Sequence, residues 1–487
     1  MLRRRGKSRF LFQPILEKST KVLFLLFLVE SYLSTLKKGH ANRVAFLFSK
    51  WWLSLQSREI LITKVFGMRI LHVIPRYVPA HGGAEQHLHE IGRRLVRDGH
   101  EVVTVTSDAR DVIALWDPKG ARFEKLHERI DGVEIRRFPL RHAPGGALTY
   151  AAVRRLLWLY SKTPCPLAPA YALSHLTPRI PGLFHWLRET QESFDVVAAM
   201  AIVFEPLVYE AWQYAQRRGI PFLLYPLTHL GAGHTPGTDD VASFYTMRHQ
   251  IALVRHADVV FAQTTDEVDF YVTHGVPRHR LVIAGVGVNP EEVLGGNGAY
   301  FREHFGVRDR PLVGMIGTLS REKGAHTLLD AALHLWTSGD NFVLALAGFI
   351  PPDFAKRLEQ VPPRWRSNIL VLGAIDNALK RHMLAALDVL VLPSRSDSFG
   401  IVFLEAWLYG TPVIGANAWG VRSVIEHNRD GILIPFGNPK ALARAIKYIL
   451  DHPEVAAVLG KRGREKVEAK HLWAHVYARV SPYYRPF

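Results

Sequence analysis

The first regular pattern of apolar and polar positions lies between residues 68 and 106. An apolar run at 68–74 precedes a glycine pair, then Leu88, Ile91 and Leu95 at helical spacing, then a second apolar run at 102–106. Two apolar runs on either side of a helical period predict a strand, a helix and a second strand. We therefore expect a βαβ unit here.

The same alternation continues to about residue 290. Further apolar runs predict strands at residues 195–199, 221–226 and 258–262, and the stretches between them predict helices that include residues 205–218 and 241–256. These runs are apolar throughout, not only at every second position. That pattern is typical of parallel strands that are covered on both faces.

A second series of strands follows the glycine-rich stretch 285–298. We expect these strands at residues 312–317, 342–347, 369–372, 388–392, 412–415 and 431–434. The predicted fold class is therefore α/β, with two Rossmann-like doubly wound domains. Each would bind a ligand at the carboxyl ends of its strands, so the chemistry is expected in a cleft between them.

The predicted domain boundaries follow from these two series. The first domain covers residues 68–290 and the second covers residues 291–468. Residues 136–188 are predicted to be an insertion in the first domain, because prolines and aromatic residues interrupt the alternation there. Within the insertion, residues 151–160 are expected to be helical.

The formal net charge of +17 comes from two segments. Residues 1–67 contain 13 Lys and Arg against three Glu, and residues 136–188 contain eight Lys and Arg and no acid. The rest of the chain is thus close to neutral, and the basic charge needs a local explanation. No nucleic-acid recognition module surrounds either segment, so nucleic acid is not an expected partner.

The N-terminal residues and the single cysteine bear on localisation. Cys165 cannot form a disulfide within the chain, which favours a reducing, cytoplasmic compartment. The apolar run 22–29 is shorter than the roughly 20 residues of a membrane span, and the residues after it do not fit a signal-peptide cleavage site. We interpret residues 1–67 as either a basic amphipathic anchor on a membrane or a non-native upstream start, and expect them to be dispensable for catalysis.

The densest group of candidate functional residues lies at 393–406, between an expected buried strand and a helix. Gly400 opens the helix, whose free N–H groups and dipole suit a phosphate. Asp397 lies in the loop before the helix and Glu405 lies one turn inside it, so both can face one ligand. The structural alternative is that Asp397 caps the helix and Glu405 is a solvated charge.

This stretch resembles the sugar-nucleotide motif of glycosyltransferase family 4, whose members have the GT-B fold, use nucleotide sugars and retain the anomeric configuration. The resemblance implies that Asp397, in place of a glutamate, holds hydroxyls of the donor sugar. It implies that Glu405 holds the ribose hydroxyls. The likeness extends over about residues 68–484, and it implies that a helix within residues 469–487 returns to the first domain.

A second match to the family is the loop from Gly317 to Gly324, after the first strand of the second domain. By resemblance, Lys323 pairs with the donor phosphates. Thr318 occupies the position of an arginine that does the same in the family, and Arg321 is close enough to substitute. Without the resemblance, these charges could equally belong to a solvated turn.

Two matches fall in the first domain. Gly82 and Gly83 follow the first strand, and glycines there let the backbone approach a pyrophosphate closely. By resemblance, this loop faces the donor phosphates, and His229, after the strand at 221–226, lies close to the donor sugar. The residues assigned to catalysis are His229, Lys323 and Asp397. Those assigned to donor binding are Gly82, Gly83, Arg321, Ser398, Phe399, Gly400 and Glu405.

The predicted function is a retaining, metal-independent transfer of a sugar from a nucleotide-sugar donor to a saccharide or lipid-linked acceptor. No Asp-x-Asp loop or metal-ligand spacing occurs in the sequence, so no metal or other cofactor is expected. The protein is expected in the cytoplasm, with an anionic membrane surface as a further partner for its basic segments. Two alternatives are a catalytically weak scaffold of the same fold at the membrane and a nucleotide-sugar 2-epimerase.

Overall fold

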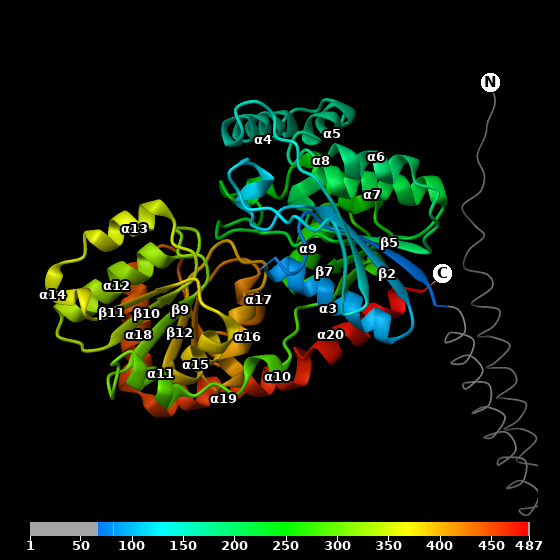
Figure 1. Ribbon diagram of the computed structural model, residues 1–487. Coiled ribbons are helices and arrows are strands. Elements are labelled where there is room, and N and C mark those ends of the chain that lie inside the picture. The colour runs from blue at the N-terminus through cyan, green and yellow to red at the C-terminus, as the bar shows by residue number, and fades with distance from the viewer. Residues whose placement is uncertain (1–66, 81, 486–487) are drawn as a thin grey trace, which may run out of the picture. The chain divides into compact units, whose positions relative to one another are not determined.

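The structure is a computed structural model that describes residues 67–80 and 82–485. The predictions for residues 1–66 therefore lie outside the described residues. From Met68 onward the chain belongs to one unit. It contains two parallel or mainly parallel sheets, each with helices on both faces, which confirms the predicted α/β class (Figure 1).

The first domain is built on an eight-stranded sheet with the order β3-β4-β2-β1-β5-β6-β7-β8. All neighbours are parallel except β3 and β4, which are antiparallel. The strands are β1 (Arg69–Val73), β2 (Glu101–Ser107), β3 (His127–Ile130), β4 (Val133–Phe138), β5 (Val196–Met200), β6 (Phe222–Tyr225), β7 (Val259–Ala262) and β8 (Leu281–Ile283). The helices of this domain are α3 (Gly83–Arg97), α4 (Ala147–Ser161), α5 (Ala168–Ser174), α6 (Pro181–Glu189), α7 (Glu205–Arg218), α8 (Arg248–His256) and α9 (Thr265–Thr273).

The second domain has a six-stranded parallel sheet with the order β11-β10-β9-β12-β13-β14. Its strands are β9 (Leu312–Ile316), β10 (Val343–Ala347), β11 (Ile369–Gly373), β12 (Val389–Leu392), β13 (Val413–Ala416) and β14 (Gly431–Ile434). Its helices are α10 (Pro290–Val293), α11 (Gly298–His304), α12 (Ala325–Thr337), α13 (Pro352–Glu359), α14 (Pro363–Arg366), α15 (Asn377–Ala386), α16 (Ile401–Leu408), α17 (Val421–Val424), α18 (Pro439–Asp451) and α19 (Pro453–Lys470).

Every strand that an apolar run predicts is present, within about two residues of its expected ends. The edge strands β3 and β8, and β4 beside β3, were not predicted. In β4, buried residues alternate with partly exposed ones, including Glu134 and Arg136, because only one of its faces is covered. Such a strand has no continuous apolar run in its sequence.

The prediction of a single helix at residues 241–256 is wrong. The structure has a short 3₁₀ turn at Ala242–Phe244 and then α8, with Met247 in an extended conformation between them. The side-chain Oε1 of Gln250 accepts the N–H of Met247 at 2.8 Å and thereby caps a new helix.

The chain passes between the domains at two adjacent places. After β8 it enters the second domain through Val288, and after α19 it returns through Leu472 to α20 (Trp473–Val480). The N–H of Val288 donates to the carbonyl of His471 at 2.9 Å, and the N–H of Trp473 donates to the carbonyl of Val288 at 3.2 Å. Side chains of α20 and of Tyr484 are buried in the core of the first domain, where they pack with β1 and β6. The last segment is therefore part of that core.

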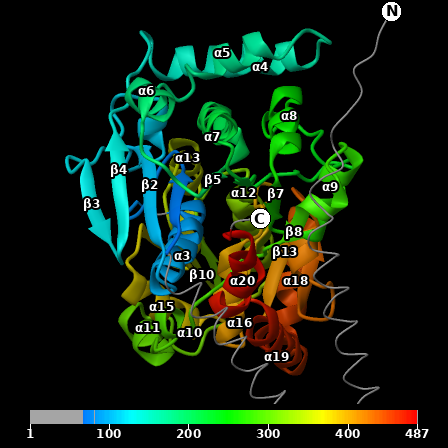
Figure 2. The ribbon, with the colours of Figure 1, turned by 90° about the vertical axis from the view of Figure 1, so that its right-hand side faces the viewer.

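Residues 136–188, predicted to be an insertion, contain the end of β4 and three helices. Residues 136–138 complete β4, and α6 packs its buried face on the core of the first domain. The helices α4 and α5 pack on each other and lie outside the layer formed by α6, α7 and α8 (Figure 2). The helix expected at 151–160 lies within α4.

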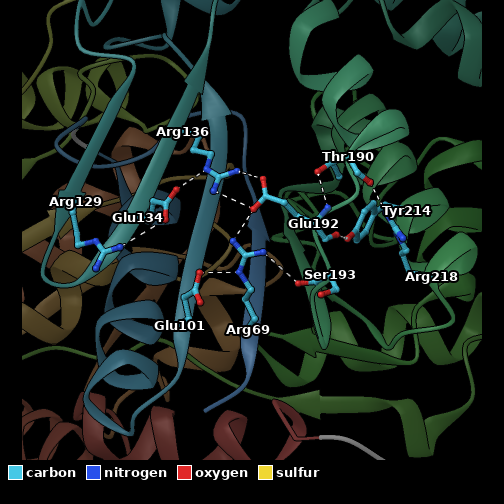
Figure 3. Close-up of polar contacts among 10 residues, drawn as sticks. All are labelled: Arg69, Glu101, Arg129, Glu134, Arg136, Thr190, Glu192, Ser193, Tyr214 and Arg218. Atoms are coloured by element: carbon cyan, nitrogen blue, oxygen red, sulfur yellow. Dashed lines mark hydrogen bonds and ion pairs between the residues drawn. The ribbon is translucent and has the colours of Figure 1, made fainter. Parts of the chain in front are cut away.

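An ionic network ties the start of the first sheet together (Figure 3). The carboxylate of Glu192, in the segment before β5, accepts from Arg69 at 2.6 Å and from Arg136 at 2.5 Å. Arg69 also contacts Glu101 at 2.8 Å, and Arg136 contacts Glu134 at 2.6 Å. The hydrogen bond from Arg136 is the main reason why the pKa of Glu192 lies below its ordinary value. Arg69 and Glu101 are the first residues of β1 and β2. The network therefore stabilises the amino-terminal end of these strands, opposite to the carboxyl ends.

In the second domain, two glycines allow close packing of α19. A Cβ at Gly460 would lie 1.7 Å from the carbonyl oxygen of Gly410, and one at Gly463 would lie 2.0 Å from the ring of Trp407. Trp407 is fully buried in α16. These contacts fix α16, which carries Glu405, against the body of its domain.

Candidate functional site

The carboxyl ends of both sheets face a cleft that contains two adjoining cavities. One has a volume of about 650 Å³ and the other of about 320 Å³. Both are lined by Gly83 from the first domain and by Gly317, Ile401 and Val402 from the second. The cavities are therefore two parts of one site between the domains, as expected for facing doubly wound sheets.

The smaller cavity brings together most of the residues predicted around the sugar. His229 comes from the loop after β6, Lys323 from the loop after β9, and Asp397 from the loop after β12. Ser398, Phe399 and Gly400 complete the wall of this cavity and also belong to the predicted set.

Lys323 and Asp397 form an ion pair within this cavity. The Nζ of Lys323 lies 2.5 Å from Oδ1 of Asp397. Burial raises the pKa of Asp397, but several neighbouring groups, of which the Lys323 ammonium is the foremost, lower it, so the net pKa lies below the ordinary value. The other carboxylate oxygen, Oδ2, is buried and has no hydrogen-bond partner among the described residues. A hydroxyl donor of a ligand would satisfy this oxygen.

His229 is held by an aromatic neighbour. Its ring stacks on Tyr245 with the ring centroids 4.4 Å apart and an angle of 3° between the planes. Burial lowers the pKa of His229 to about 4, with a further lowering by Lys323 and an opposing effect of Asp397. The imidazole is therefore neutral at neutral pH. It can donate or accept one hydrogen bond, but it carries no charge.

Helix α16 begins at this cavity. Gly400 precedes its first turn with a φ of +87°, and a Cβ there would lie 2.6 Å from the ring of Phe403. Glycine is therefore required at this position for both reasons. The first N–H groups of α16 have no partner within the helix, so its start can accept an anion.

Glu405 and the two glycines of the first domain line the larger cavity. Glu405 is almost fully buried, and its Oε1 lies 2.6 Å from the Nζ of Lys380 in α15. Gly82 and Gly83 stand at the start of α3. This cavity thus joins a carboxylate, an ammonium and a helix start, a combination that suits a polar ligand with a phosphate.

The structure does not bring Arg321 into either cavity. Its side chain is 70% exposed, and its guanidinium lies 3.4 Å from Asp353 at the start of α13. Lys380, which lines the larger cavity, and Tyr245, which supports His229, are among the residues of the site that were not predicted. Lys380 looks like a solvated helix charge in the sequence, and Tyr245 was assigned to the middle of a helix. No signal in the sequence alone marks either of them.

Within residues 67–80 and 82–485, no three His, Cys, Asp or Glu side chains are grouped so that they could hold a metal ion. In that part of the chain, no helix is both long and apolar enough to span a bilayer.

Family models match both domains. Residues 82–287 match the model described as Glycosyl transferase 4-like domain, and residues 299–466 match the model described as Glycosyl transferases group 1. The boundary between the two matches falls at the first crossing between the domains.

Sequence relatives cover parts of the chain. An alpha-D-kanosaminyltransferase of Streptomyces kanamyceticus is 29% identical over 189 residues, which are 38% of this chain and 48% of the relative. A D-inositol 3-phosphate glycosyltransferase of Stackebrandtia nassauensis is 25% identical over 291 residues, 54% of this chain and 62% of the relative. A GDP-mannose-dependent alpha-(1-6)-phosphatidylinositol monomannoside mannosyltransferase of Mycobacterium tuberculosis is 28% identical over 196 residues, 38% of this chain and 50% of the relative. The chain thus spans about half to three fifths of the length of these relatives.

Solved structures match nearly the whole described chain. Anabaena Alr3699/HepE in complex with UDP and glucose superposes with a TM-score of 0.62 at 18% identity, over 86% of this chain and 99% of that one. Sucrose-phosphate synthase from Thermosynechococcus elongatus gives a TM-score of 0.61 at 21% identity, over 86% and 98%. At such identities the likeness shows the fold, which is GT-B. Together, this fold and the two family matches show that the chain has the GT-B fold and that each of its two domains is similar to a glycosyltransferase domain.

Proposed function

We propose that this protein transfers a sugar from a nucleotide-sugar donor to a saccharide or lipid-linked acceptor, with retention of configuration and without a metal ion. The observation that carries the proposal is the convergence of Lys323, Asp397 and the start of α16 on one cavity, beside a second cavity that holds Glu405. The two cavities match the two ends of a nucleotide sugar.

The nucleoside lies in the larger cavity in this proposal, with its ribose hydroxyls on Glu405. Glu405 is paired with the ammonium of Lys380, and a carboxylate makes stronger hydrogen bonds to hydroxyls than a neutral acceptor does. The sugar lies in the smaller cavity, where the unpaired Oδ2 of Asp397 accepts one of its hydroxyls.

The departing diphosphate is stabilised between the two cavities. Lys323, the backbone N–H groups near Gly82 and Gly83, and the start of α16 supply positive charge and dipoles around this point. Charge that builds on the leaving group is the main quantity to be stabilised, and fixed dipoles in a protected cleft do this without reorganisation. An oxygen of the leaving phosphate takes the acceptor's proton, so no carboxylate base is required.

The acceptor approaches from the first domain, where His229 lines the smaller cavity and Tyr245 stacks on its ring. A relative that matches 38% of this chain is named for a phosphatidylinositol mannoside acceptor, which supports a lipid-linked acceptor. The cytoplasm, at the inner face of a membrane, is the proposed location.

The first test is a thermal-shift screen of UDP-, GDP- and ADP-sugars, followed by donor hydrolysis and transfer assays with the best donor. Lys323→Ala and Glu405→Ala should each weaken donor binding or turnover by about 10- to 150-fold, the effect of losing one charge-assisted contact of about 1.5–3 kcal/mol. Arg321→Ala is the matched control, because Arg321 lies outside both cavities, and it should behave as wild type.

The same assays separate the alternatives. A scaffold would bind a donor without hydrolysing or transferring its sugar, and a 2-epimerase would release the C2 epimer without any acceptor. If both cavity variants keep wild-type affinity and turnover, the proposed site is wrong.

A further inference from the structure

One side of helix α4 is apolar and faces solvent. Leu148, Leu156 and Leu159 have relative exposures of 82%, 54% and 49%. Leu156 and Leu159 follow Leu148 by eight and eleven residues, so the three side chains lie on one face of the helix, with the exposed Ala152 between them. Three exposed leucines on one short helix form a patch, in contrast to the scattered single residues of an ordinary surface.

The opposite side of α4 is fixed to the domain. Val153 and Leu157 are buried against Met247 and Ala170, and Arg154 is buried beside Glu205 of α7 at 2.6 Å. The Nε1 of Trp158 also donates to Ser243 at 3.0 Å. The leucines therefore cannot turn inward without breaking a buried ion pair, and their exposure is a stable property of this domain.

Basic residues accompany the leucines. Arg155 and Lys162 are exposed on the same side of α4, and both stack on the ring of Trp158 at 4.2 Å. Arg141 and Arg179, also exposed, are joined through a backbone hydrogen bond at 3.0 Å. No acidic residue occurs between residues 139 and 188. The surface is thus apolar and positive, with no carboxylate in its own segment.

We propose that this face of α4, defined by Leu148, Leu156, Leu159, Arg155 and Lys162, docks on an anionic lipid bilayer. Leucines enter the boundary between head groups and acyl chains, while arginine and lysine remain at the lipid phosphates. A second copy of this chain fits less well, because two such faces would bring like charges together. Nucleic acid would leave the three leucines without an apolar partner.

The docking face is connected to the cleft by direct contacts. Arg154, on the inner side of α4, donates to the carbonyl of Phe244 at 3.4 Å, and the next residue, Tyr245, stacks on His229. In both ribbon views α4 and α5 form the outer layer of the first domain (Figures 1 and 2). The inference deepens the proposed function, on which it rests for the acceptor: it specifies a membrane-bound, lipid-linked acceptor.

Cys165 provides a local probe for the test. It is exposed, it lies between α4 and α5, and it is the single cysteine of the chain. The full-length protein is labelled there with the fluorophore NBD and mixed with vesicles of phosphatidylcholine containing 0 or about 30% phosphatidylglycerol. We expect an emission increase and blue shift with the anionic vesicles only, and quenching by nitroxide-labelled lipid. A probe at this site reports on α4 and α5, whatever residues 1–67 do.

Substitutions on the face then test the residues. Leu156→Asp and Leu159→Asp should each raise the lipid concentration needed for the NBD response at least about tenfold, because each puts a charge where an exposed leucine would enter the bilayer. Arg155→Glu with Lys162→Glu should weaken it roughly fivefold or more, and added salt should do the same to wild type. The matched control is Val458→Asp, a similarly exposed apolar residue on α19, which should leave the response unchanged.

Donor affinity, measured in solution without lipid, keeps this test separate from the proposed function. Leu156→Asp should bind the nucleotide sugar as wild type does, which also shows that the variant is folded. The proposal is overturned if the NBD signal ignores anionic vesicles, if it changes with protein concentration alone, or if the leucine variants respond as Val458→Asp does.

Discussion

Gly83 and Ile401 face each other across the cleft, and a Cβ at position 83 would lie 3.2 Å from Cδ1 of Ile401. Both residues line both cavities, so this contact marks the passage between them. Gly83 opens α3 and Ile401 opens α16. A diphosphate that joins a nucleoside to a sugar would lie at this passage, between two helix starts.

Filling the passage should weaken donor binding in proportion to side-chain size. Gly83→Ala requires a shift of a few tenths of an ångström and should cost less than about threefold in affinity, whereas Gly83→Val should cost about 5- to 150-fold, as overpacking by 1–3 kcal/mol does. Titration calorimetry measures the affinity of each variant for the donor. The unfolding temperature of Gly83→Ala should not fall below that of wild type, since alanine favours a helix more than glycine does. Equal affinities across the series would contradict the assignment of the passage.

The buried, neutral His229 should make the protein less stable in acid. Its pKa is about 4 in the folded state against about 6.5 when unfolded, so the unfolded chain binds the proton first. Stability is then lost as the pH falls from about 6.5 towards 4, on the order of 2–3 kcal/mol from this residue. His229→Phe keeps a ring beside Tyr245 and removes the titration. Urea unfolding between pH 7 and 4.5 should show a smaller loss for this variant, and parallel curves would count against the burial of the imidazole.

Transfer should continue in excess EDTA. The sequence has no Asp-x-Asp loop, and Lys323 with the two helix starts provides the positive charge for the leaving diphosphate in the proposed mechanism. The initial rate with the best donor should therefore change by less than about twofold after chelation and dialysis. A complete loss of rate that Mg²⁺ or Mn²⁺ restores would require a different mechanism.

The close packing of α19 predicts a stability effect that is remote from the cleft. In Gly460→Ala the new methyl group would meet the carbonyl of Gly410, so the helix must move, at a cost of about 1–3 kcal/mol. Gly182→Ala, on α6, is the control, since its Cβ would make an ordinary contact of 3.5 Å with Phe138 of β4. Thermal unfolding should show a lower midpoint for the first variant and an equal or higher one for the second. Equal midpoints would contradict this prediction, because they would mean that α19 can shift away from Gly410 without loss of stability.

The sequence predicted the central strands because strands covered on both faces have continuous apolar runs. It missed β3 and β4, whose charged positions, such as Glu134 and Arg136, reflect an exposed face. Asp397 was predicted from local spacing and from the family resemblance, and Lys323 from the resemblance; both line one cavity in the structure. Arg321, two residues from Lys323, was predicted with them, but the turn directs it to Asp353. Lys380 meets Glu405 only through the packing of α15 beside α16, which no local pattern encodes.

The return of α20 has a consequence for the order of events during synthesis. Domains generally fold from the N-terminus as the chain leaves the ribosome. Here the core of the first domain includes Trp473, Val476, Val480 and Tyr484, which are translated after the whole of the second domain. The second domain contains all of its own strands before these residues exist. The domain whose synthesis begins first therefore completes its core only after the second domain has been made.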